Sequence, residues 1–298
     1  MPPADALAPE RPGGGAADPE RASDGAGPVL EVRGVTVHFG GVSALTDVTL
    51  SVDRGSVTGL IGPNGAGKTT LFNVISGLQV PNSGVVVFEG RDLARVRPHR
   101  RARLGIARTF QRLELFGSLT AEDNVRVGLE SSIRWWQWHR LRASFPWARD
   151  EAGDGARATG SRVVGLADRL LAGVGLAGHE SEQSSAMPTG SARMVELARA
   201  LAMQPKLVLL DEPGSGLDEH ESEALGSLLQ RLAADGMAVL LVEHDMELVM
   251  RVCDRVHVLD FGHIIASGTP DEVRADPRVQ KAYLGASAGS APAAGGDV

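Results

Sequence analysis

One glycine-rich loop constrains this chain more than any other feature of its sequence. It reads Gly62-Pro63-Asn64-Gly65-Ala66-Gly67-Lys68-Thr69 and matches the pattern G-x-x-x-x-G-K-[ST]. The short apolar run Val57–Ile61 precedes the loop, and a helical pattern at Thr70–Ser76 follows it. In this context, backbone N–H groups and a helix N-terminus surround phosphate groups. We expect Lys68 to reach the β- and γ-phosphates of a nucleotide and the Thr69 hydroxyl to ligate Mg²⁺.

A second apolar run ends in two acids. Leu207–Leu210 is uninterrupted, as expected of a strand that is buried on both faces of a parallel sheet, and Asp211 and Glu212 follow it directly. A buried strand that ends in a carboxylate would place Asp211 beside the magnesium ion. Glu212 is then the candidate general base on the attacking water, a role worth about 10²–10⁴ in rate.

The next apolar run leads into a histidine. Ala238–Val242 is followed by Glu243-His244-Asp245, and a helical stretch at about 219–234 joins this strand to the previous one. Strand, helix and strand in this order predict an α/β fold with a parallel sheet. Neighbouring strands would bring His244 to the γ-phosphate side, so we favour a role for it in hydrolysis over a packing role.

Composition and length limit the class of protein. The chain has 298 residues and a net charge of −7, with no apolar run of about 18 residues that could span a membrane. Its single cysteine, Cys253, cannot form an internal disulfide, which fits a reducing compartment. Residues 1–28 and 286–298 are rich in small residues and are predicted to be disordered tails around a domain at 29–285.

Together, these motifs resemble the ATP-binding subunits of ABC transporters, and the resemblance covers nearly all of 29–285. It implies a P-loop NTPase core of the ABC ATPase type with an antiparallel β portion and an inserted helical subdomain at about 113–197. It also implies that ATP is bound with Mg²⁺, which Thr69, Gln111 and Asp211 would hold. The residues expected to contact ATP are Phe39, Gly62, Pro63, Asn64, Gly65, Ala66, Gly67, Lys68, Thr69 and Thr70.

The resemblance gives roles to several further positions. Gln111, which ends Ala107–Gln111, is similar to the family's glutamine loop, which senses Mg²⁺ and links the site to the helical subdomain. His244 is similar to its switch histidine, and Asp218 ends a loop that touches the opposite subunit. Phe39 stands where such subunits stack an aromatic ring on adenine, although a core aromatic at a strand end is an equal alternative.

Shorter motifs are similar to one branch of this family, the branched-chain amino-acid importers, and to their G-type ATPase. They are Phe39–Gly41, Gly105–Gln111, Glu196–Leu201, Gly268–Val273 and Ala282–Gly285. This resemblance implies a subunit at the cytoplasmic face of the plasma membrane. Its expected partners are a second ABC ATPase in a heterodimer, two membrane permeases and, indirectly, an external solute-binding protein.

One loop departs from the family pattern. The signature Leu-Ser-Gly-Gly-Gln, which completes the ATP site of the opposite subunit, reads Met187-Pro188-Thr189-Gly190-Ser191 here. Pro188 replaces a serine and offers neither a hydroxyl nor an N–H donor. Ser191 replaces the glutamine, whereas Gly190 and a helix expected from about 192 remain, so a helix N-terminus can still face the anion. We therefore expect two unequal ATP sites, one built around Lys68 and Glu212 and one weakened by Pro188.

Other interpretations remain open. The cargo could instead be urea, short amides or lipid-linked molecules, and a soluble ABC ATPase is a further alternative. Eight arginines in 91–112 favour a solvated helix face, with room for one arginine near phosphate, over a nucleic-acid site, because stacking aromatics do not alternate with them. Trp135, Trp136, Trp138 and Trp147 could form either a local apolar patch or a contact surface for a permease.

Overall fold

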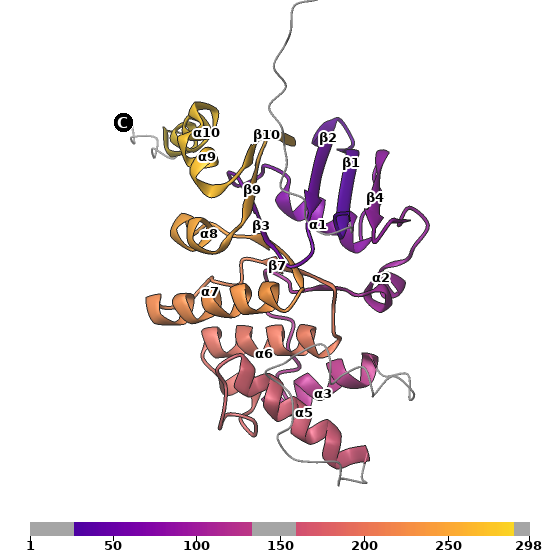
Figure 1. Ribbon diagram of the computed structural model, residues 1–298, viewed down its shortest axis with the longest axis vertical. Coiled ribbons are helices and arrows are strands. Elements are labelled where there is room, and N and C mark those ends of the chain that lie inside the picture. Colours follow the sequence, from indigo (N-terminus) through magenta and orange to yellow (C-terminus); the bar gives the residue numbers. More distant parts are fainter. Residues whose placement is uncertain (1–26, 133–158, 289–298) are drawn as a thin grey trace, which may run out of the picture.

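The computed structural model describes residues 27–132 and 159–288, in which two β-sheets and a set of helices pack together (Figure 1). The strands are β1 (Leu30–Phe39), β2 (Val42–Val52), β3 (Val57–Ile61), β4 (Ser83–Phe88), β5 (Arg91–Asp92), β6 (Ile106–Arg108), β7 (Leu207–Asp211), β8 (Ala238–Val242), β9 (Arg255–Asp260) and β10 (His263–Gly268). The helices are α1 (Lys68–Ser76), α2 (Pro98–Leu104), α3 (Ala121–Ser132), α5 (Thr159–Gly173), α6 (Thr189–Ala202), α7 (Glu219–Ala234), α8 (Met246–Val252), α9 (Pro270–Ala275) and α10 (Pro277–Ala288), with a short 3₁₀ turn at Ser184–Ala186.

The larger sheet has six strands in the order β10-β9-β3-β8-β7-β6. Its strands are parallel except for β10, which pairs antiparallel with β9. Both faces are covered, since Leu207 and Leu209 of β7 join one apolar core while Val208 and Leu210 join the other. Burial on both faces explains why this strand and β8 are continuous apolar runs.

The smaller sheet is antiparallel, in the order β2-β1-β4-β5. Helix α1 lies between the two sheets, and its side chains Leu71, Phe72 and Ile75 are fully buried in the core that the sheets share. The antiparallel β portion expected from the sequence is therefore present. The smaller sheet packs on one side of α1, and the larger sheet packs on the other side (Figure 1).

Helices α3, α5 and α6 form the helical part, which lies below α7 in Figure 1. Its apolar residues, among them Leu129, Leu170 and Val195, belong to the same core as the other face of the large sheet. The expected helical subdomain at about 113–197 thus contains α3, α5 and the start of α6. None of the helices in 27–132 and 159–288 is long and apolar enough to cross a membrane.

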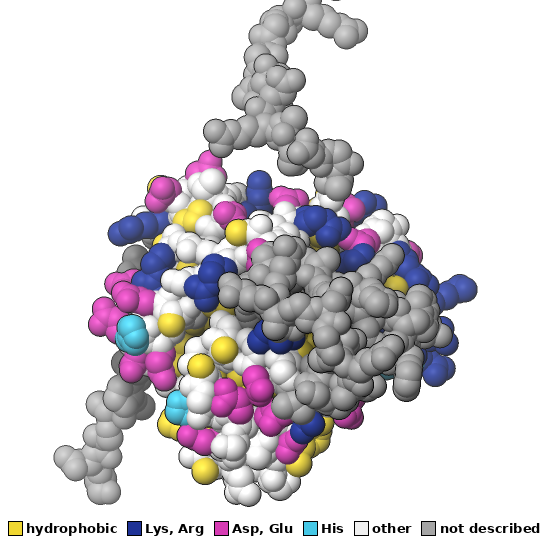
Figure 2. All heavy atoms as spheres, turned by 60° about the horizontal axis from the view of Figure 1, so that its bottom comes forward, with side chains coloured by type: hydrophobic (Ala, Val, Ile, Leu, Met, Phe, Trp, Pro, Cys, Tyr) yellow, Lys and Arg dark blue, Asp and Glu magenta, His cyan; other side chains and the backbone are white. Residues whose placement is uncertain are grey.

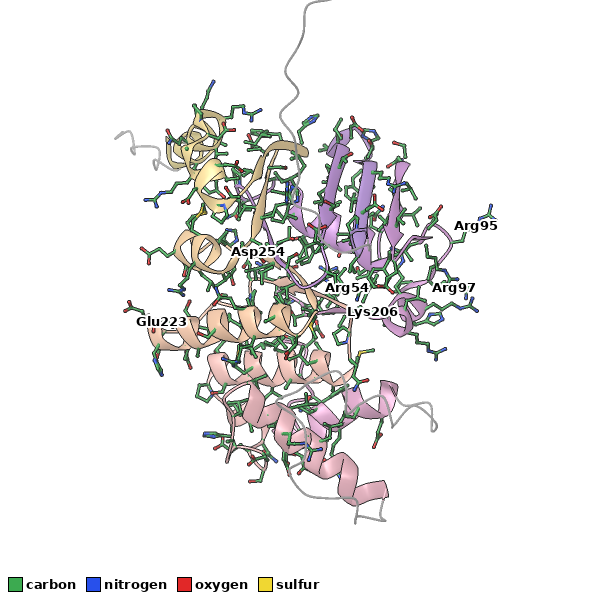
Figure 3. The ribbon with its side chains drawn as sticks, in the orientation of Figure 1. Arg54, Arg95, Arg97, Lys206, Glu223 and Asp254 are labelled. Atoms are coloured by element: carbon green, nitrogen blue, oxygen red, sulfur yellow. The ribbon has the colours of Figure 1, made fainter. Side chains whose placement is uncertain are left out.

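Some expectations need correction, and others cannot be compared. Helix α7 spans Glu219–Ala234, as predicted, but α6 begins at Thr189 rather than at about 192. Two arginines of the basic run, Arg101 and Arg108, are buried rather than part of a solvated face. In contrast, Arg95 and Arg97 point outward before α2 (Figure 3). The four tryptophans and most of the two tails lie outside the described residues.

Acidic and basic side chains are interspersed on the face of the molecule shown in Figure 2. Glu89 connects the two sheets at the surface, because it forms ion pairs with Arg54 and with Lys206, which lie close together (Figure 3). These ion pairs lower the pKa of Glu89, with the hydrogen bond to Lys206 as the largest cause.

Candidate functional site

The phosphate loop connects β3 to α1, and its last glycine is required by space. Gly67 has φ of 109°, and a Cβ on it would lie 2.6 Å from the carbonyl oxygen of Ala44 and 2.8 Å from a methyl of Leu45. Glycine is therefore the only residue that fits without a shift of the backbone. The first turn of α1 carries no acidic side chain, so its N-terminal N–H groups and dipole remain available to an anion.

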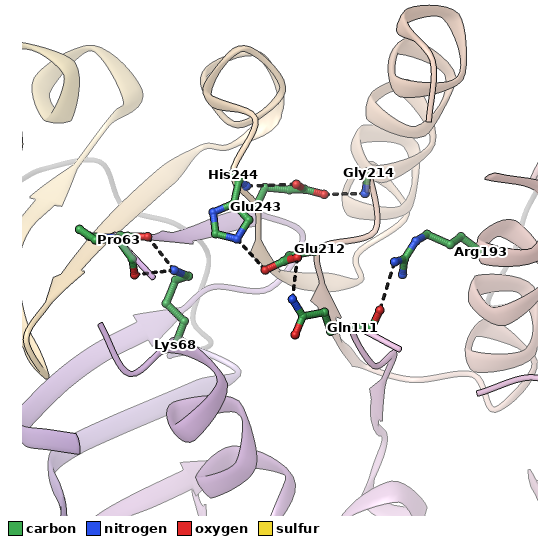
Figure 4. Close-up of polar contacts among 9 residues, drawn as sticks. Pro63, Lys68, Gln111, Arg193, Glu212, Gly214, Glu243 and His244 are labelled. Carbon is green, nitrogen blue, oxygen red and sulfur yellow. Dashed lines mark hydrogen bonds and ion pairs between the residues drawn. The ribbon is translucent and has the colours of Figure 1, made fainter. Parts of the chain in front are cut away.

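Lys68 is the first residue of α1, and its ammonium lies against its own loop. Nζ donates to the carbonyl oxygens of Gly62 at 2.6 Å and Pro63 at 3.0 Å (Figure 4). Burial lowers the pKa of Lys68, while the carboxylates of Glu212 and Asp211 act in the opposite direction. The two carbonyl groups offer the Lys68 ammonium only partial negative charge, whereas a phosphate bound in the loop would offer it a full negative charge. Thr69, which is exposed, and the half-buried Thr70 follow in the same turn.

Three predicted residues meet at the carboxylate of Glu212 (Figure 4). His244 Nε2 lies 2.6 Å from Oε1, and Gln111 Nε2 donates to Oε2 at 2.9 Å. Glu212 has φ of 53°, a left-handed conformation that costs a residue other than glycine about 1–3 kcal/mol and is common at active sites. The strained backbone and the two contacts fix the carboxylate at the end of β7, where it can accept a proton from water.

Asp211 ends β7 and is almost completely buried. Its Oδ2 lies 3.3 Å from Arg108 Nη2, and the two side chains are 3% and 7% exposed. Burial raises the pKa of Asp211, and the charge of Arg108 acts against this shift. Asp211 and Lys68 also interact electrostatically, so the expected phosphate and metal residues share one site.

Glu243, which precedes His244, holds the loop that follows β7. Its Oε1 accepts a hydrogen bond from the Gly214 backbone at 2.6 Å, and its Oε2 accepts one from the His244 backbone at 3.2 Å (Figure 4). Burial raises the pKa of Glu243. The sequence placed this acid at a strand end, but only the fold reveals that it joins the His244 segment to the Gly214 loop.

Sequence reasoning missed two residues of α6 that hold the glutamine loop. Arg193 donates through Nη2 to the carbonyl oxygen of Gln111 at 3.1 Å and through Nε to that of Ser215 at 2.9 Å. Glu196 is 3% exposed, and burial raises its pKa against the effect of hydrogen bonds to the backbone of Phe110 and Glu114. No local spacing rule predicts these contacts, because Gln111 lies 82 residues before Arg193 and Ser215 lies 22 residues after it.

The expected cross-subunit residues lie at the starts of two helices. Gly190 is buried in the first turn of α6, where a Cβ would lie 2.8 Å from Glu221 Oε1. The half-buried Ser191 follows it. Asp218 is the N-cap of α7 and forms a reciprocal capping box with Glu221. In the described residues, none of these contacts reaches Lys68 or Glu212 directly.

Phe39 ends β1 and is 49% exposed, so its ring does not belong to the core. The alternative of a core aromatic is therefore wrong. At the other end of the chain, Tyr283 in α10 contacts the phosphate loop. Burial raises the pKa of Tyr283 to about 12, and a hydrogen bond to the backbone of Gly62 acts in the opposite direction.

Comparisons with known proteins agree with this geometry. The family model described as ABC transporter matches residues 45–215, and the model described as branched-chain amino acid ATP-binding cassette transporter matches residues 263–289. The chain is 36% identical to the high-affinity branched-chain amino acid transport ATP-binding protein LivG of Salmonella typhimurium, over 87% of this chain and 98% of LivG. It is 32% identical to the lipopolysaccharide export system ATP-binding protein LptB of Haemophilus influenzae, over 86% of this chain and 97% of LptB.

Solved structures agree as well. The ADP conformation of MJ1267, an ATP-binding cassette of an ABC transporter, superposes with a TM-score of 0.72 at 29% identity, over 87% of this chain and 99% of that one. A dimeric post-hydrolysis state of the cassette MJ0796 with ADP and Pi gives a TM-score of 0.68 at 25% identity, over 81% and 98%. With its phosphate loop, its Glu212 centre and these relatives, the chain belongs to the ABC transporter family as one of its ATP-binding proteins.

Proposed function

We propose that this protein hydrolyses ATP to power a separate membrane permease that imports branched-chain amino acids. The observation that carries the hydrolytic part is the carboxylate of Glu212, which His244 and Gln111 hold from two sides next to the Lys68 loop. The cargo is supported by the similarity to LivG, a branched-chain amino acid transport ATP-binding protein, and by the branched-chain family model that matches residues 263–289.

The residues of the site divide the work. The phosphate loop and Lys68 bind the phosphates, and the exposed ring of Phe39 stacks on adenine. Glu212 takes a proton from the attacking water, while His244 and Gln111 keep its carboxylate in position. Charge on the γ-phosphate increases during transfer, and the α1 N-terminus and Lys68 supply fixed positive charge for it.

The residues present fit a magnesium ion. The donors are the Thr69 hydroxyl, the Asp211 carboxylate and the Gln111 amide oxygen, and Mg²⁺ prefers oxygen ligands. Within 27–132 and 159–288, no three His, Cys, Asp or Glu side chains gather as a metal site. A donor set with the single carboxylate of Asp211 still suits Mg²⁺, because proteins commonly hold this ion through one or two carboxylates together with substrate phosphates. When bound, the ion would neutralise phosphate charge.

The proposed assembly contains a second ABC ATPase. Gly190, Ser191 and Asp218 would contact the nucleotide or the loop of that partner, and the partner's signature would cover the Lys68 site. The pair would sit on two permeases at the cytoplasmic face of the membrane, with an external binding protein that delivers the amino acid. The dimeric structure of the MJ0796 cassette supports pairing of such cassettes.

Export of a lipid-linked molecule is a second candidate, because the chain also matches the lipopolysaccharide export protein LptB. Uptake in a strain that lacks this gene separates the two. Wild type should restore uptake of labelled leucine, isoleucine and valine. Glu212→Gln should not restore it, whereas Glu223→Gln should, because Glu223 is exposed and lies at the outer edge of the molecule (Figure 3). Normal leucine uptake without the gene would refute the amino-acid cargo.

A mass measurement of Glu212→Gln tests the pairing. With Mg-ATP, light scattering on a sizing column should report a dimer only when the partner ATPase is present, because Pro188 weakens the second site. A dimer of this chain alone would show that Met187–Ser191 closes a site well enough, and the proposed asymmetry would be wrong.

A further inference from the structure

Arg108 at the end of β6 contacts several parts of the proposed ATP site. Its Nη1 donates to Asn73 Oδ1 at 2.7 Å and to Ser76 Oγ at 3.1 Å, both on the phosphate-loop helix α1. Its Nη2 lies 3.3 Å from Asp211 Oδ2. One buried guanidinium thus links α1 to the acid at the end of β7.

The same guanidinium also contacts the glutamine loop. Its Cζ lies 4.8 Å from the centre of the Phe110 ring and 5.5 Å from that of Phe72. Contacts of a cation with aromatic rings at such distances are attractive, more so when they are shielded from water. Phe110 directly precedes Gln111, so the position of Asp211 and the start of the glutamine loop depend on one side chain.

A second buried arginine shows what a purely structural role looks like in this fold. Arg101 is 6% exposed and donates to the backbone carbonyls of Val74, Ile75, Leu93 and Val96. None of these four partners is a residue of the predicted site, and the carboxylate that acts on the charge of Arg101 is that of Asp92 in β5. Arg108 is buried to a similar degree, but its partners are side chains, and one of them is the acid expected at the magnesium ion.

We propose that Arg108 is a positioning residue that fixes the Asp211 carboxylate for Mg²⁺. The inference rests on the proposed magnesium site. Arg108 engages Oδ2, and a carboxylate accepts several hydrogen bonds, so Oδ1 remains for the ion or its water. Lys68 supplies charge nearby, but Arg108 supplies direction, because its planar guanidinium is anchored on α1 through Nη1 while Nη2 contacts one oxygen of the carboxylate.

The test measures nucleotide binding and not only turnover. A fluorescent ADP analogue is titrated into each protein in EDTA and then over a range of Mg²⁺ concentrations. Arg108→Gln should bind the analogue in EDTA within about twofold of wild type. The Mg²⁺ concentration at half-maximal effect should rise by about tenfold, the size expected for loss of one charged hydrogen bond. Arg108→Lys should recover part of the shift.

Two controls keep the result interpretable. Arg103→Gln removes an exposed arginine of the same basic run and should leave the Mg²⁺ midpoint unchanged. Asn73→Ala loosens the anchor of Arg108 without removing its charge, so it should shift the midpoint in the same direction by a smaller factor. This variant keeps the test available if Arg108→Gln does not fold.

The outcomes separate the inference from the proposal on which it rests. A wild-type protein whose binding ignores Mg²⁺ would refute the magnesium site itself. A wild type that responds to Mg²⁺ together with Arg108 variants of unchanged midpoint would overturn only the role of Arg108. Equal losses of binding in EDTA and in Mg²⁺ would also overturn it, because they would mean that Arg108 merely shapes the loop.

Discussion

His244 Nε2 lies 2.6 Å from one carboxylate oxygen of Glu212, and the amide of Gln111 donates to the other oxygen at 2.9 Å. The three side chains come from the end of β8, the end of β7 and the loop after β6. No two of these segments are adjacent in sequence, so the contact depends on strand order. If Glu212 acts as the proposed general base, these two contacts fix the orientation in which its carboxylate meets the attacking water.

We predict that His244→Ala slows ATP hydrolysis by about 100-fold or more, the usual loss when an acid–base site loses a partner. Nucleotide binding should change little, because His244 contacts Glu212 and not the phosphate loop. Phosphate release at saturating ATP is the measurement, and the exposed His220→Ala is the matched control. A rate above one tenth of wild type would contradict the assignment.

Pro188→Ser should change turnover more than stability. Pro188 is the N-cap of α6 and its side chain accepts no hydrogen bond there, whereas a serine cap is worth about 1 kcal/mol. Loss of the rigid proline costs about 0.4–1 kcal/mol through the unfolded chain, so the two effects nearly cancel. The free energies of unfolding of wild type and Pro188→Ser, measured in urea, should agree within about 1 kcal/mol. ATP turnover of the complex with the partner ATPase should rise; unchanged turnover would mean that the asymmetry has no effect.

His257 should make stability depend on pH. Burial lowers its pKa from the ordinary 6.5 to about 4, and its ring contacts Ser267 Oγ at 2.7 Å. Between these two values the unfolded chain binds more protons than the folded one, so stability falls as pH falls from about 6.5 towards 4. The full effect is about 3 kcal/mol at most, from 1.36 kcal/mol per unit.

The measurement is urea unfolding of wild type and His257→Gln across that pH range. The difference between the two free energies of unfolding isolates this histidine from the acids that titrate in the same range. The free energy of unfolding of wild type, relative to that of His257→Gln, should be lower at pH 4 than at pH 7. A difference that stays constant with pH would show that His257 takes up its proton equally in the folded and unfolded chains, which would contradict the prediction.

Tyr283→Phe tests the contact between the C-terminal helix and the phosphate loop. The change removes the hydroxyl that hydrogen-bonds the Gly62 backbone and keeps the buried ring. A lost hydrogen bond of this kind costs about 1 kcal/mol, so we expect ATP affinity to fall severalfold while the fold persists. Fluorescent ATP binding is the readout, with the exposed Lys281→Gln as control. Identical affinities would assign Tyr283 to packing alone.

The sequence predicts those strands and helices whose bounds depend on a local pattern of residues. The apolar runs Val57–Ile61 and Ala238–Val242 are strands with the expected bounds, and α7 spans its predicted 219–234. Asp218 and Glu221 cap that helix reciprocally, so its start is encoded within four residues. The phosphate loop and the Glu212 strand are predicted in the same way, because each combines a motif with a flanking apolar run.

What the sequence could not give depends on distant partners. Arg108 looked like one member of a basic run, but its carboxylate partner Asp211 lies 103 residues later. The start of α6 was placed at about 192 instead of Thr189, because Pro188 is a poor marker of an N-cap. Proline fits the extended backbone that a cap needs, although it offers no side-chain acceptor.

Arg193 has a mechanical consequence. Its guanidinium donates to the carbonyl oxygens of Gln111 and Ser215, which belong to the loops that follow β6 and β7. The fork is planar and rigid, so α6 cannot tilt without pulling on both loops at once. A load applied to the helical part, as by a neighbouring protein, would therefore arrive at Gln111 and Ser215 simultaneously. Arg193 would therefore transmit a movement of α6 to both loops next to Glu212.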